Sequence, residues 1–417
     1  MDQILVRGGN KLAGRVKISG AKNAVLPILA ASLMSSQGEV NLTSVPELMD
    51  VAVMRDVLIS LGASATHEGE NLTIDARHIS GSEAPYNLVS KMRASVLVMG
   101  PLLGRTGRAR VPLPGGCAIG TRPLDLHLKG FQLLGAEVFV GKGYVEASAD
   151  RLLGSTIYLD YPSVGATENI MMAACFAEGE TKIQNAAEEP EIVDLACFIN
   201  SMGGRVDGAG TDTITIHGVR TLRGSEYRVI PDRIEAGTFM VAAAISGGRL
   251  VLENVIPEHV VSITAKLREL GVTITWEEDC LVVQGNGRPA AVDLKTLPYP
   301  GFPTDMQPQM MALLALAAGN CMVTETVFEN RFMHVPELRR MGADIRIDGR
   351  SALVQGRPAF SGVPVEASDL RAGAALILAA LAAEGVTEVH GVHHVERGYD
   401  DIVAKLKAVG ADIWRSV

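Results

Sequence analysis

Hydrophobic and polar positions along the chain repeat one arrangement six times. In each copy an amphipathic helix ends at a Leu, Met or Val that is followed by glycine and then by Ala, Gly or Val. The six glycines are Gly62, Gly135, Gly203, Gly271, Gly342 and Gly410, spaced 73, 68, 68, 71 and 68 residues apart. We predict that each glycine is the left-handed C-terminal cap of its helix. Such a regular period indicates a repeated structural unit.

A second helix in each copy is apolar on nearly every side. The six predicted segments are 24–33, 94–103, 169–177, 236–245, 309–318 and 372–383. A helix without a polar face has to be buried. Short apolar segments accompany the helices, for example Thr213–Ile216 followed by Tyr227–Ile230, which we interpret as a strand pair. The predicted unit is therefore strand, buried helix, strand, surface helix, strand, strand.

Six such units exceed what one core holds, because the chain has 417 residues and a domain usually contains about 100 to 200. We predict an α/β fold with two domains of three units each, in which the sheets surround the buried helices. The segment from Ile4 to Ser19 has no surface helix before it, so we expect it to complete the set begun by the C-terminal units. The predicted domains are residues 22–229 and residues 1–21 together with 230–417.

The composition fits a globular protein without a nucleic-acid surface. The chain is 47% hydrophobic and 20% charged, and its net charge is -9 without any Lys or Arg tract. Its longest apolar runs fall short of the ~20 residues that cross a bilayer. Five cysteines without paired spacing suit a reducing compartment, and the first residues show no export signal. We therefore expect a cytoplasmic protein.

Cys117 differs from the other cysteines in its surroundings. It lies among Gly115, Gly116 and Gly120 in a segment without helical or strand periodicity, which is typical of an exposed loop. Such a thiol is either a reactive group or a small buried hydrophobic side chain. Cys175 and Cys197 lie within apolar runs, and we predict that both are buried.

Basic residues stand where buried helices begin, at Lys22, Arg93 and Arg371. A positive side chain opposes the dipole at a helix N-terminus, and a bound anion would offset that cost. The alternative is an ion pair with a nearby acid, such as Asp369 with Arg371. Three copies also carry an arginine near the surface helix, at Arg122, Arg331 and Arg397. Arginine can hold a carboxylate or phosphate through two parallel hydrogen bonds.

Eight segments together resemble the UDP-N-acetylglucosamine 1-carboxyvinyltransferase family of enolpyruvyl transferases. They are Gly20–Asn23, Met92–Ser95, Leu113–Cys117, Ser163–Thr167, Pro231–Glu235, Phe302–Gln307, Phe328–Phe332 and Asp369–Arg371. The resemblance implies two inside-out, barrel-like α/β domains of three repeats each, with the active site in the cleft between them. It also implies transfer of the enolpyruvyl group of phosphoenolpyruvate to the 3-hydroxyl of UDP-N-acetylglucosamine, with release of phosphate. This is the committed step of peptidoglycan synthesis in the bacterial cytoplasm.

The same resemblance implies roles for individual residues. Cys117 is the proton donor and can hold a covalent phosphoenolpyruvate adduct, Asp305 is the base, and Lys22 and Arg397 complete the catalytic set. The implied substrate-binding residues are Lys22, Asn23, Arg93, Arg122, Pro123, Leu124, Asp125, Leu126, Ser163, Val164, Gly165, Asp305, Val327, Arg331, Asp369, Arg371 and Arg397. Tyr161 stands where some family members carry a lysine, so the nucleotide contact there stays open. No cofactor, nucleic acid, membrane insertion or obligate protein partner is expected, and no metal site, because His393 and His394 lack ligand partners at suitable spacing.

Two alternatives remain open from the sequence. The first is 3-phosphoshikimate 1-carboxyvinyltransferase activity, which uses the same fold and chemistry but lacks the glycine-flanked cysteine loop. The second is a repeat-built protein that senses a UDP-sugar without converting it. A sensor would need neither an acid such as Cys117 nor a base such as Asp305, so the complete catalytic set argues against it.

Overall fold

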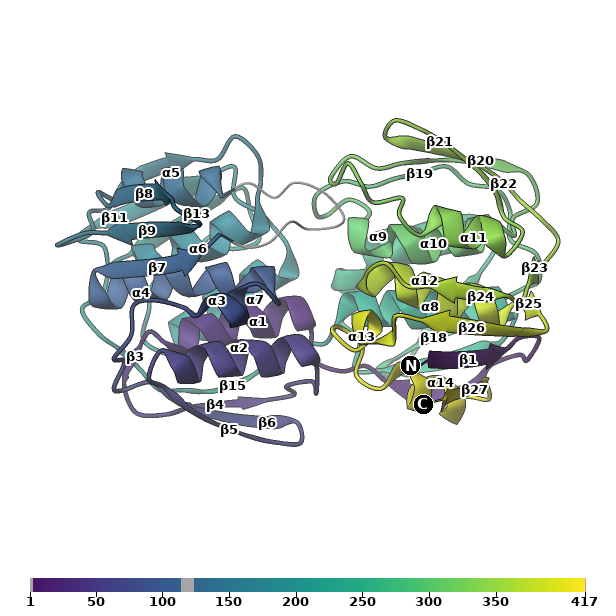
Figure 1. Cartoon of the computed structure of the whole chain (residues 1–417), viewed down its shortest axis with the longest axis horizontal. Coiled ribbons are helices and arrows are strands. Elements are labelled where there is room, and N and C mark those ends of the chain that lie inside the picture. Colours follow the sequence, from purple (N-terminus) through teal and green to yellow (C-terminus); the bar gives the residue numbers. More distant parts are fainter. Residues whose placement is uncertain (1–2, 114–123, 417) are drawn as a thin grey trace. The chain divides into compact units, whose positions relative to one another are not determined.

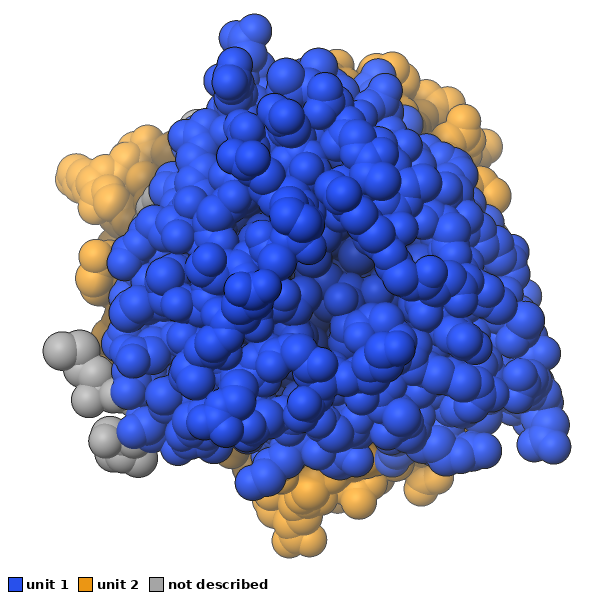
Figure 2. Space-filling view, turned by 90° about the vertical axis from the view of Figure 1, so that its right-hand side faces the viewer, with its two compact units in different colours: residues 1–19, 118–121, 231–417 blue, residues 20–117, 122–230 orange. Residues whose placement is uncertain are grey.

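The computed structural model describes residues 3–113 and 124–416, and these form two compact units. Unit 1 comprises residues 3–19 and 231–416 of the described chain, and unit 2 comprises residues 20–113 and 124–230 (Figure 1). Figure 2 distinguishes the two units by colour. In the described ranges the chain passes from one unit to the other after residue 19 and after residue 230.

The core of unit 2 is formed by three helices that are buried over most of their length. They are α1 (Lys22–Ser32), α4 (Met99–Thr106), which continues the 3-10 segment η1 (Arg93–Val98), and α6 (Val164–Ala174). The helix α4 packs against α6, and η1 contacts both α1 and α6. Because their apolar side chains point in every direction, each helix needs neighbours on all sides. The prediction of buried helices in these three copies is confirmed.

Three sheets accompany these helices. Their strand orders are β10-β11-β13-β12, β15-β4-β6-β5 and β7-β9-β8, with a short additional pair β14-β3. The strands are β3 (Ser35–Gln37), β4 (Val40–Thr43), β5 (Ser64–Glu68), β6 (Asn71–Asp75), β7 (Arg108–Pro112), β8 (Glu137–Gly141), β9 (Tyr144–Ser148), β10 (Thr156–Tyr158), β11 (Glu180–Gln184), β12 (Val206–Asp207), β13 (Thr213–His217), β14 (Leu222–Arg223) and β15 (Glu226–Arg228). In Figure 1 the helices α1 and α4 lie between the sheet of β4 and the sheet of β9.

Unit 1 repeats this plan with the helices α8 (Arg233–Ser246), α10 (Gln307–Leu314) and α12 (Leu370–Leu381), which all contact one another. Its sheets have the orders β24-β26-β1-β27, β17-β18-β16-β2 and β19-β20-β22-β21, with a short pair β23-β25. The strands are β1 (Gln3–Arg7), β2 (Ala13–Lys17), β16 (Arg249–Glu253), β17 (Thr273–Glu277), β18 (Cys280–Gln284), β19 (Leu294–Lys295), β20 (Asn320–Thr324), β21 (Asp344–Asp348), β22 (Ser351–Gln355), β23 (Phe360–Ser361), β24 (Pro364–Glu366), β25 (Ala383–Glu384), β26 (Val386–His390) and β27 (Asp412–Ser416).

Each repeat ends its surface helix with the predicted glycine cap. The helices are α2 (Met49–Ser60), α5 (Asp125–Leu133), α7 (Pro190–Ser201), α9 (Val261–Glu269), α11 (Val335–Arg340) and α14 (Ile402–Ala408). The six glycines have φ angles between 91° and 104°. After α11, the Gly342 N–H donates to Arg339 O at 2.9 Å and the Ala343 N–H donates to Leu338 O at 3.0 Å. These two bonds define a Schellman cap, so the prediction is confirmed.

Two strands pair within one unit although each leads into the first helix of the other unit. The strand β2 leads into α1 of unit 2 but pairs in parallel with β16 of unit 1. The strand β15 leads into α8 of unit 1 but pairs in parallel with β4 of unit 2. The prediction that Tyr227–Ile230 pairs with Thr213–Ile216 is therefore wrong. The antiparallel partners of β13 are β11 and β12, and β12 follows α7 closely enough to return beside β13.

The shorter helical segments are α3 (Tyr86–Val89), η2 (Pro257–Val260), η3 (Thr304–Met306) and α13 (Val392–Val395). Near the start of the chain, β1 lies between β26 and β27 and is antiparallel to both, as the predicted completion of the C-terminal units requires. Over the described ranges, the helices are too short or too polar to form a membrane span.

Candidate functional site

In unit 1 two buried arginines meet at one carboxylate. The Arg331 Nη2 lies 2.8 Å from Asp305 Oδ1, and the Arg371 Nη2 lies 3.0 Å from Asp305 Oδ2. The arginine side chains are only 3% and 2% exposed, whereas the Asp305 side chain is 25% exposed. Charge-assisted bonds of this kind hold a carboxylate in one orientation. Asp305 is thus fixed from within the protein while part of it remains open to solvent.

The start of α12 explains how Arg371 reaches Asp305. The Asp369 Oδ1 accepts hydrogen bonds from the backbone N–H groups of Arg371 at 2.9 Å and Ala372 at 3.1 Å. Asp369 is therefore the N-cap of α12, and its carboxylate accepts hydrogen bonds from backbone N–H groups of the first turn. The Arg371 guanidinium forms its ion pair with Asp305 and not with Asp369, because it donates to Asp305 through Nε and Nη2.

Two donors of this cluster have no hydrogen-bond acceptor within the described part of the chain. They are the Nε of Arg331 and the Nη1 of Arg371, and both atoms are buried. A buried donor that lacks an acceptor costs about 1 to 3 kcal/mol, and more when it is charged. Such donors are expected where an anionic ligand supplies the missing acceptor. The cluster therefore has the chemistry of an anion site beside a carboxylate.

Glu325 positions the segment that carries Val327 and Arg331. Its side chain accepts hydrogen bonds from Thr296 Oγ1 at 2.8 Å, from Thr304 Oγ1 at 3.0 Å and from the Val327 N–H at 2.8 Å. Glu325 is 1% exposed, so these bonds replace the water that it has lost. Because Thr304 adjoins Asp305, Glu325 ties the two sides of the cluster together. The sequence analysis did not single out Glu325. The one feature that could have indicated it is its position directly after a strand with alternating apolar and polar residues.

Arg397, the remaining predicted site residue of unit 1, is partly buried beyond the end of α13. It lies near His394, whose pKa is lowered first by burial and then by the charges of His393 and Arg397. The structure thus brings Asp305, Arg331 and Arg371 into direct contact with one another.

In unit 2 the predicted residues Lys22 and Asn23 open the helix α1. The Lys22 Nζ lies 2.7 Å from Asp50 Oδ2, and the two side chains are 11% and 4% exposed. Asp50 belongs to the first turn of α2, where a negative charge is favourable. The carboxylate therefore offsets the unfavourable position of Lys22 at a helix N-terminus. Asp50 was missed from the sequence, because its partner lies on another helix.

A second group of predicted residues in unit 2 surrounds His127. The His127 Nδ1 lies 3.0 Å from the Asn169 amide nitrogen. Burial lowers the pKa of His127 to about 4, and the positive charge of Arg93 adds to this shift. The imidazole is therefore neutral at pH 7. Since its Nδ1 accepts from Asn169, its proton is on Nε2.

Close packing around His127 brings the predicted segments together. A Cβ atom on Gly165 would lie 3.3 Å from His127 Cε1, so glycine permits this approach of the first turn of α6 to α5. Ser163 caps α6, because its side chain accepts from the Ala166 N–H. Leu124 directly precedes α5, and Asp125 and Leu126 belong to the first turn of that helix. His127 thus joins two predicted substrate-binding segments, 124–126 and 163–165, and sequence reasoning did not single it out.

Three predicted site residues, Cys117, Arg122 and Pro123, lie outside the described residues. Of the other cysteines, Cys175 is 1% exposed, and burial raises its pKa to about 12, so the prediction of a core thiol is confirmed. The same prediction for Cys197 is wrong, because that residue is exposed. It lies on the outward stripe of α7 with Val193 and Asn200, and the apolar neighbours in sequence belong to the opposite face.

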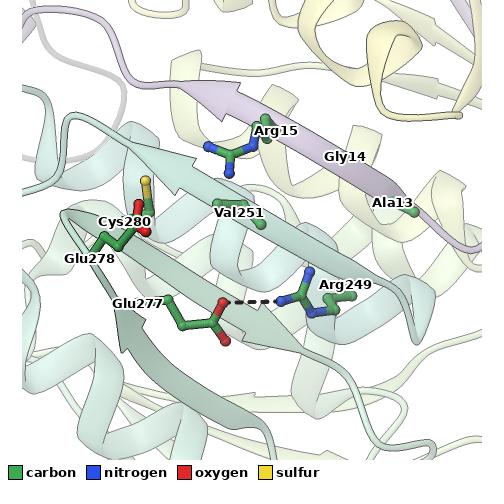
Figure 3. Close-up of a pocket in the computed structure, with 8 residues that line it drawn as sticks. All are labelled: Ala13, Gly14, Arg15, Arg249, Val251, Glu277, Glu278 and Cys280. Carbon is green, nitrogen blue, oxygen red and sulfur yellow. Dashed lines mark hydrogen bonds and ion pairs between the residues drawn. The ribbon is translucent and has the colours of Figure 1, made fainter.

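One cavity of unit 1 lies away from the predicted residues. It measures about 420 Å³ and is lined by residues of β2, β16 and the β17–β18 hairpin (Figure 3). Its two arginines are paired with acids, Arg15 with Glu253 at 2.7 Å and Arg249 with Glu277 at 3.4 Å. The cavity therefore offers little free positive charge to an anion. Among residues 3–113 and 124–416, no cluster of three or more His, Cys, Asp and Glu side chains has the arrangement of a metal site.

Comparison with known proteins gives matches along the whole chain. A family model described as EPSP synthase (3-phosphoshikimate 1-carboxyvinyltransferase) matches residues 6–406. The UDP-N-acetylglucosamine 1-carboxyvinyltransferase 2 of Carboxydothermus hydrogenoformans is 58% identical over 100% of this chain and 99% of its own length. The UDP-N-acetylglucosamine 1-carboxyvinyltransferase 1 of Caldanaerobacter subterraneus subsp. tengcongensis is 60% identical over 99% of both chains.

Solved structures resemble the fold over its full length. The enolpyruvyl transferase NikO from Streptomyces tendae has a TM-score of 0.89 and 28% identity, covering 100% of this chain and 99% of its own. An EPSP synthase from Acinetobacter baumannii has a TM-score of 0.78 and 20% identity, with 100% of both chains covered. The mixed α/β fold is therefore that of the enolpyruvyl transferases.

Proposed function

The chain belongs to the UDP-N-acetylglucosamine 1-carboxyvinyltransferases of the enolpyruvyl transferase family, and from this membership we propose the reaction that it catalyses. It transfers the enolpyruvyl group of phosphoenolpyruvate to the 3-hydroxyl of UDP-N-acetylglucosamine and releases phosphate. This reaction is the committed step of peptidoglycan synthesis. We place it in the bacterial cytoplasm, with these two small molecules as substrates and without an obligate protein partner.

The observation that carries the proposal is the contact of Asp305 with Arg331 and Arg371. Phosphoenolpyruvate has a carboxylate and a phosphate, so it requires several fixed cations. The buried unpaired donors of Arg331 and Arg371 are suited to such an anion. Asp305, partly exposed beside them, is suited to accept a proton from an alcohol that lies against it. Its contribution comes from position, because a carboxylate is a weak base for an alcohol.

The reaction proceeds by addition and elimination. As the sugar hydroxyl oxygen bonds to the central carbon of phosphoenolpyruvate, its proton passes to Asp305 and the methylene carbon takes a proton, which the family resemblance assigns to Cys117. The resulting ketal then loses phosphate, and a proton leaves the methyl group to restore the double bond. Lys22, Arg122, Arg371 and Arg397 form the proposed clamp for the anionic donor. Water has to be excluded, because it would trap the cationic character at the central carbon.

We further infer that the two units are the two domains of the family, each an inside-out barrel of three repeats, and that both contribute to one active site. Unit 1 supplies Asp305, Val327, Arg331, Asp369, Arg371 and Arg397. Unit 2 supplies Lys22, Asn23, Arg93, Cys117, Arg122, Pro123, Leu124, Asp125, Leu126, Ser163, Val164 and Gly165. The arrangement of three buried helices with three sheets in each unit supports this inference. The group around His127 and Arg93 is assigned to the UDP-sugar.

A phosphate-release assay with purified protein tests the proposed function. Phosphoenolpyruvate is supplied either with UDP-N-acetylglucosamine or with shikimate 3-phosphate. We expect turnover with the UDP-sugar alone. Turnover with shikimate 3-phosphate alone would instead assign 3-phosphoshikimate 1-carboxyvinyltransferase activity. Saturable binding of the UDP-sugar without phosphate release would indicate a sensor.

A further inference from the structure

A buried tyrosine supports the arginine that holds Asp305. Tyr399 lies between α13 and α14 and is 3% exposed. The Cζ of Arg371 lies 5.4 Å from the centroid of its ring. A guanidinium group at this distance from an aromatic face is attracted by the ring, and more strongly when both are removed from water. Arg371 is 2% exposed and meets this condition.

The hydroxyl of Tyr399 is fixed by side chains of two core helices. It lies 2.9 Å from Thr238 Oγ1 of α8 and 3.2 Å from the Gln309 Nε2 of α10. Thr238 donates its single proton to Ile234 O at 2.8 Å. The Tyr399 hydroxyl must therefore donate to Thr238, and it accepts from Gln309. With one bond donated and one accepted, the tyrosine ring has a defined orientation.

The Arg371 guanidinium is therefore held by two different groups, the Asp305 carboxylate and the Tyr399 ring. Asp305 accepts hydrogen bonds from its Nε at 3.3 Å and its Nη2 at 3.0 Å, along one edge of the planar guanidinium. The ring of Tyr399 provides a second, aromatic contact. An edge contact alone leaves rotation of the group about that edge, and a neighbouring ring restricts it. The remaining Nη1 is buried without an acceptor in the described chain, so its direction matters for any anion that binds there.

We propose that Tyr399 is a positioning residue for the transferase reaction: through its ring it orients Arg371, and through Arg371 it orients Asp305. Thr238 and Gln309 fix the ring. This inference rests on the proposed function, because it assigns Arg371 to the anionic donor. It predicts that loss of the ring affects the use of phosphoenolpyruvate more than the binding of the UDP-sugar.

Steady-state kinetics of two variants test the proposal, with phosphoenolpyruvate and UDP-N-acetylglucosamine varied in turn. Tyr399→Leu removes the ring and should lower kcat/KM for phosphoenolpyruvate roughly tenfold, while KM for the UDP-sugar changes less than about twofold. Tyr399→Phe keeps the ring and should retain kcat/KM within about threefold of the wild type. The conservative variant thus restores most of what leucine loses.

Phe360→Leu is the matched control. Phe360 is a buried aromatic residue of unit 1 on β23, the strand that pairs with β25. It should lower the unfolding temperature and leave both KM values and kcat close to those of the wild type. Thr238→Val should lower kcat/KM for phosphoenolpyruvate by about twofold to threefold, with no further loss in the Tyr399→Phe background, because the same bond is already absent.

The outcomes separate the two hypotheses. A wild-type protein without turnover overturns the proposed function and this inference with it. Wild-type turnover together with a Tyr399→Leu variant that behaves like Phe360→Leu overturns the inference alone. Equal losses in Tyr399→Leu and Tyr399→Phe would also overturn it, because the ring would then have no part in orienting Arg371.

Discussion

Asp305 combines solvent access with two ion pairs, and this combination distinguishes it from the other acids near the site. Asp50 pairs with Lys22 and is 4% exposed, and Asp369 accepts hydrogen bonds from the N-terminus of α12. Asp305 is held by Arg331 and Arg371 yet remains a quarter exposed. A fixed and accessible carboxylate is what proton transfer from a bound alcohol requires.

The substitution Asp305→Ala should therefore lower turnover much more than it weakens binding of the UDP-sugar. We expect phosphate release to fall by at least about a hundredfold, in the range typical for loss of a general base. UDP-sugar affinity, measured by calorimetry, should change far less. Asp293→Ala, on the loop before β19, is a control that should leave release unchanged. Near-normal release by Asp305→Ala would reject its role as base.

The thiol of Cys117 is the predicted proton donor, and its reactivity can be tested by covalent labelling. The substitution Cys117→Ser should abolish labelling by epoxide reagents such as fosfomycin, measured as a mass increase of the intact protein. Cys197→Ser removes an exposed thiol of unit 2 and should leave labelling intact. Full labelling of Cys117→Ser would exclude this thiol as the modified group.

Neutral His127 should make the protein sensitive to acid. The pKa of His127 in the folded protein is about 4, below the ordinary value of 6.5. Between pH 6.5 and pH 4 the imidazole is therefore protonated in the unfolded state but neutral in the folded state. The contribution to stability is fully present above pH 6.5 and is lost as the pH falls to about 4. The expected loss is on the order of 3 kcal/mol.

Urea unfolding at several pH values tests this expectation. His127→Gln should lose less stability than the wild type between pH 6.5 and pH 4, because the variant has no imidazole to protonate. Parallel pH profiles for the two proteins would show that His127 is not the responsible group.

At the level of single residues, the sequence reveals position along a helix better than contact. Lys22 and Arg371 were recognisable because each begins a buried helix. Their partners Asp50 and Asp305 were not recognised as such, since each pair is formed by side chains from different elements. Cys197 shows the same limit, because apolar neighbours in sequence do not tell which face of α7 a residue occupies.

At the level of elements, the six glycine caps are the most predictable feature. Each requires a left-handed backbone that only glycine adopts without strain, so the requirement is visible in the sequence. The parallel partners of β2 and β15 were not predictable, because the local pattern of a strand does not specify its partner. The erroneous pairing of Tyr227–Ile230 with Thr213–Ile216 followed from assuming that successive strands are neighbours.

Gly342 offers a test of the cap itself. A Cβ atom there would meet no other atom within 4 Å, so only the backbone conformation opposes a side chain. Gly342→Ala should lower the free energy of unfolding by about 1 kcal/mol, and Gly342→Asn by less, because asparagine tolerates the left-handed conformation better. Chemical denaturation measures both. An alanine variant as stable as the wild type would contradict the predicted strain.

At the level of the whole molecule, the described strands of unit 2 all lie between residues 20 and 230, whereas those of unit 1 come from two separate stretches of the chain. Residues 20–230 include every strand of the unit 2 sheets, β15 among them. Residues 231–417 lack β1 and β2, which complete two sheets of unit 1. We expect the fragment 20–230 to unfold cooperatively and the fragment 231–417 to remain unfolded, as measured by circular dichroism during thermal denaturation.

Adding residues 1–19 to the second fragment through a short linker after residue 417 should restore its folding. The pairing of Gln3 with Ser416 places the two ends to be joined side by side. A cooperative transition of fragment 231–417 by itself would show that β1 and β2 are dispensable.

The insertion of β1 between β26 and β27 also constrains the order of events on the ribosome. The strand β1 is synthesised long before β26 and β27, with which it pairs. The described strands of unit 2 are complete once residue 230 has emerged, so this unit can fold during translation, whereas the sheet of β1 closes only after residue 416 has emerged. Until β26 and β27 have been made, β1 lacks both of its partner strands, and a chaperone that covers unpaired strands would be needed there.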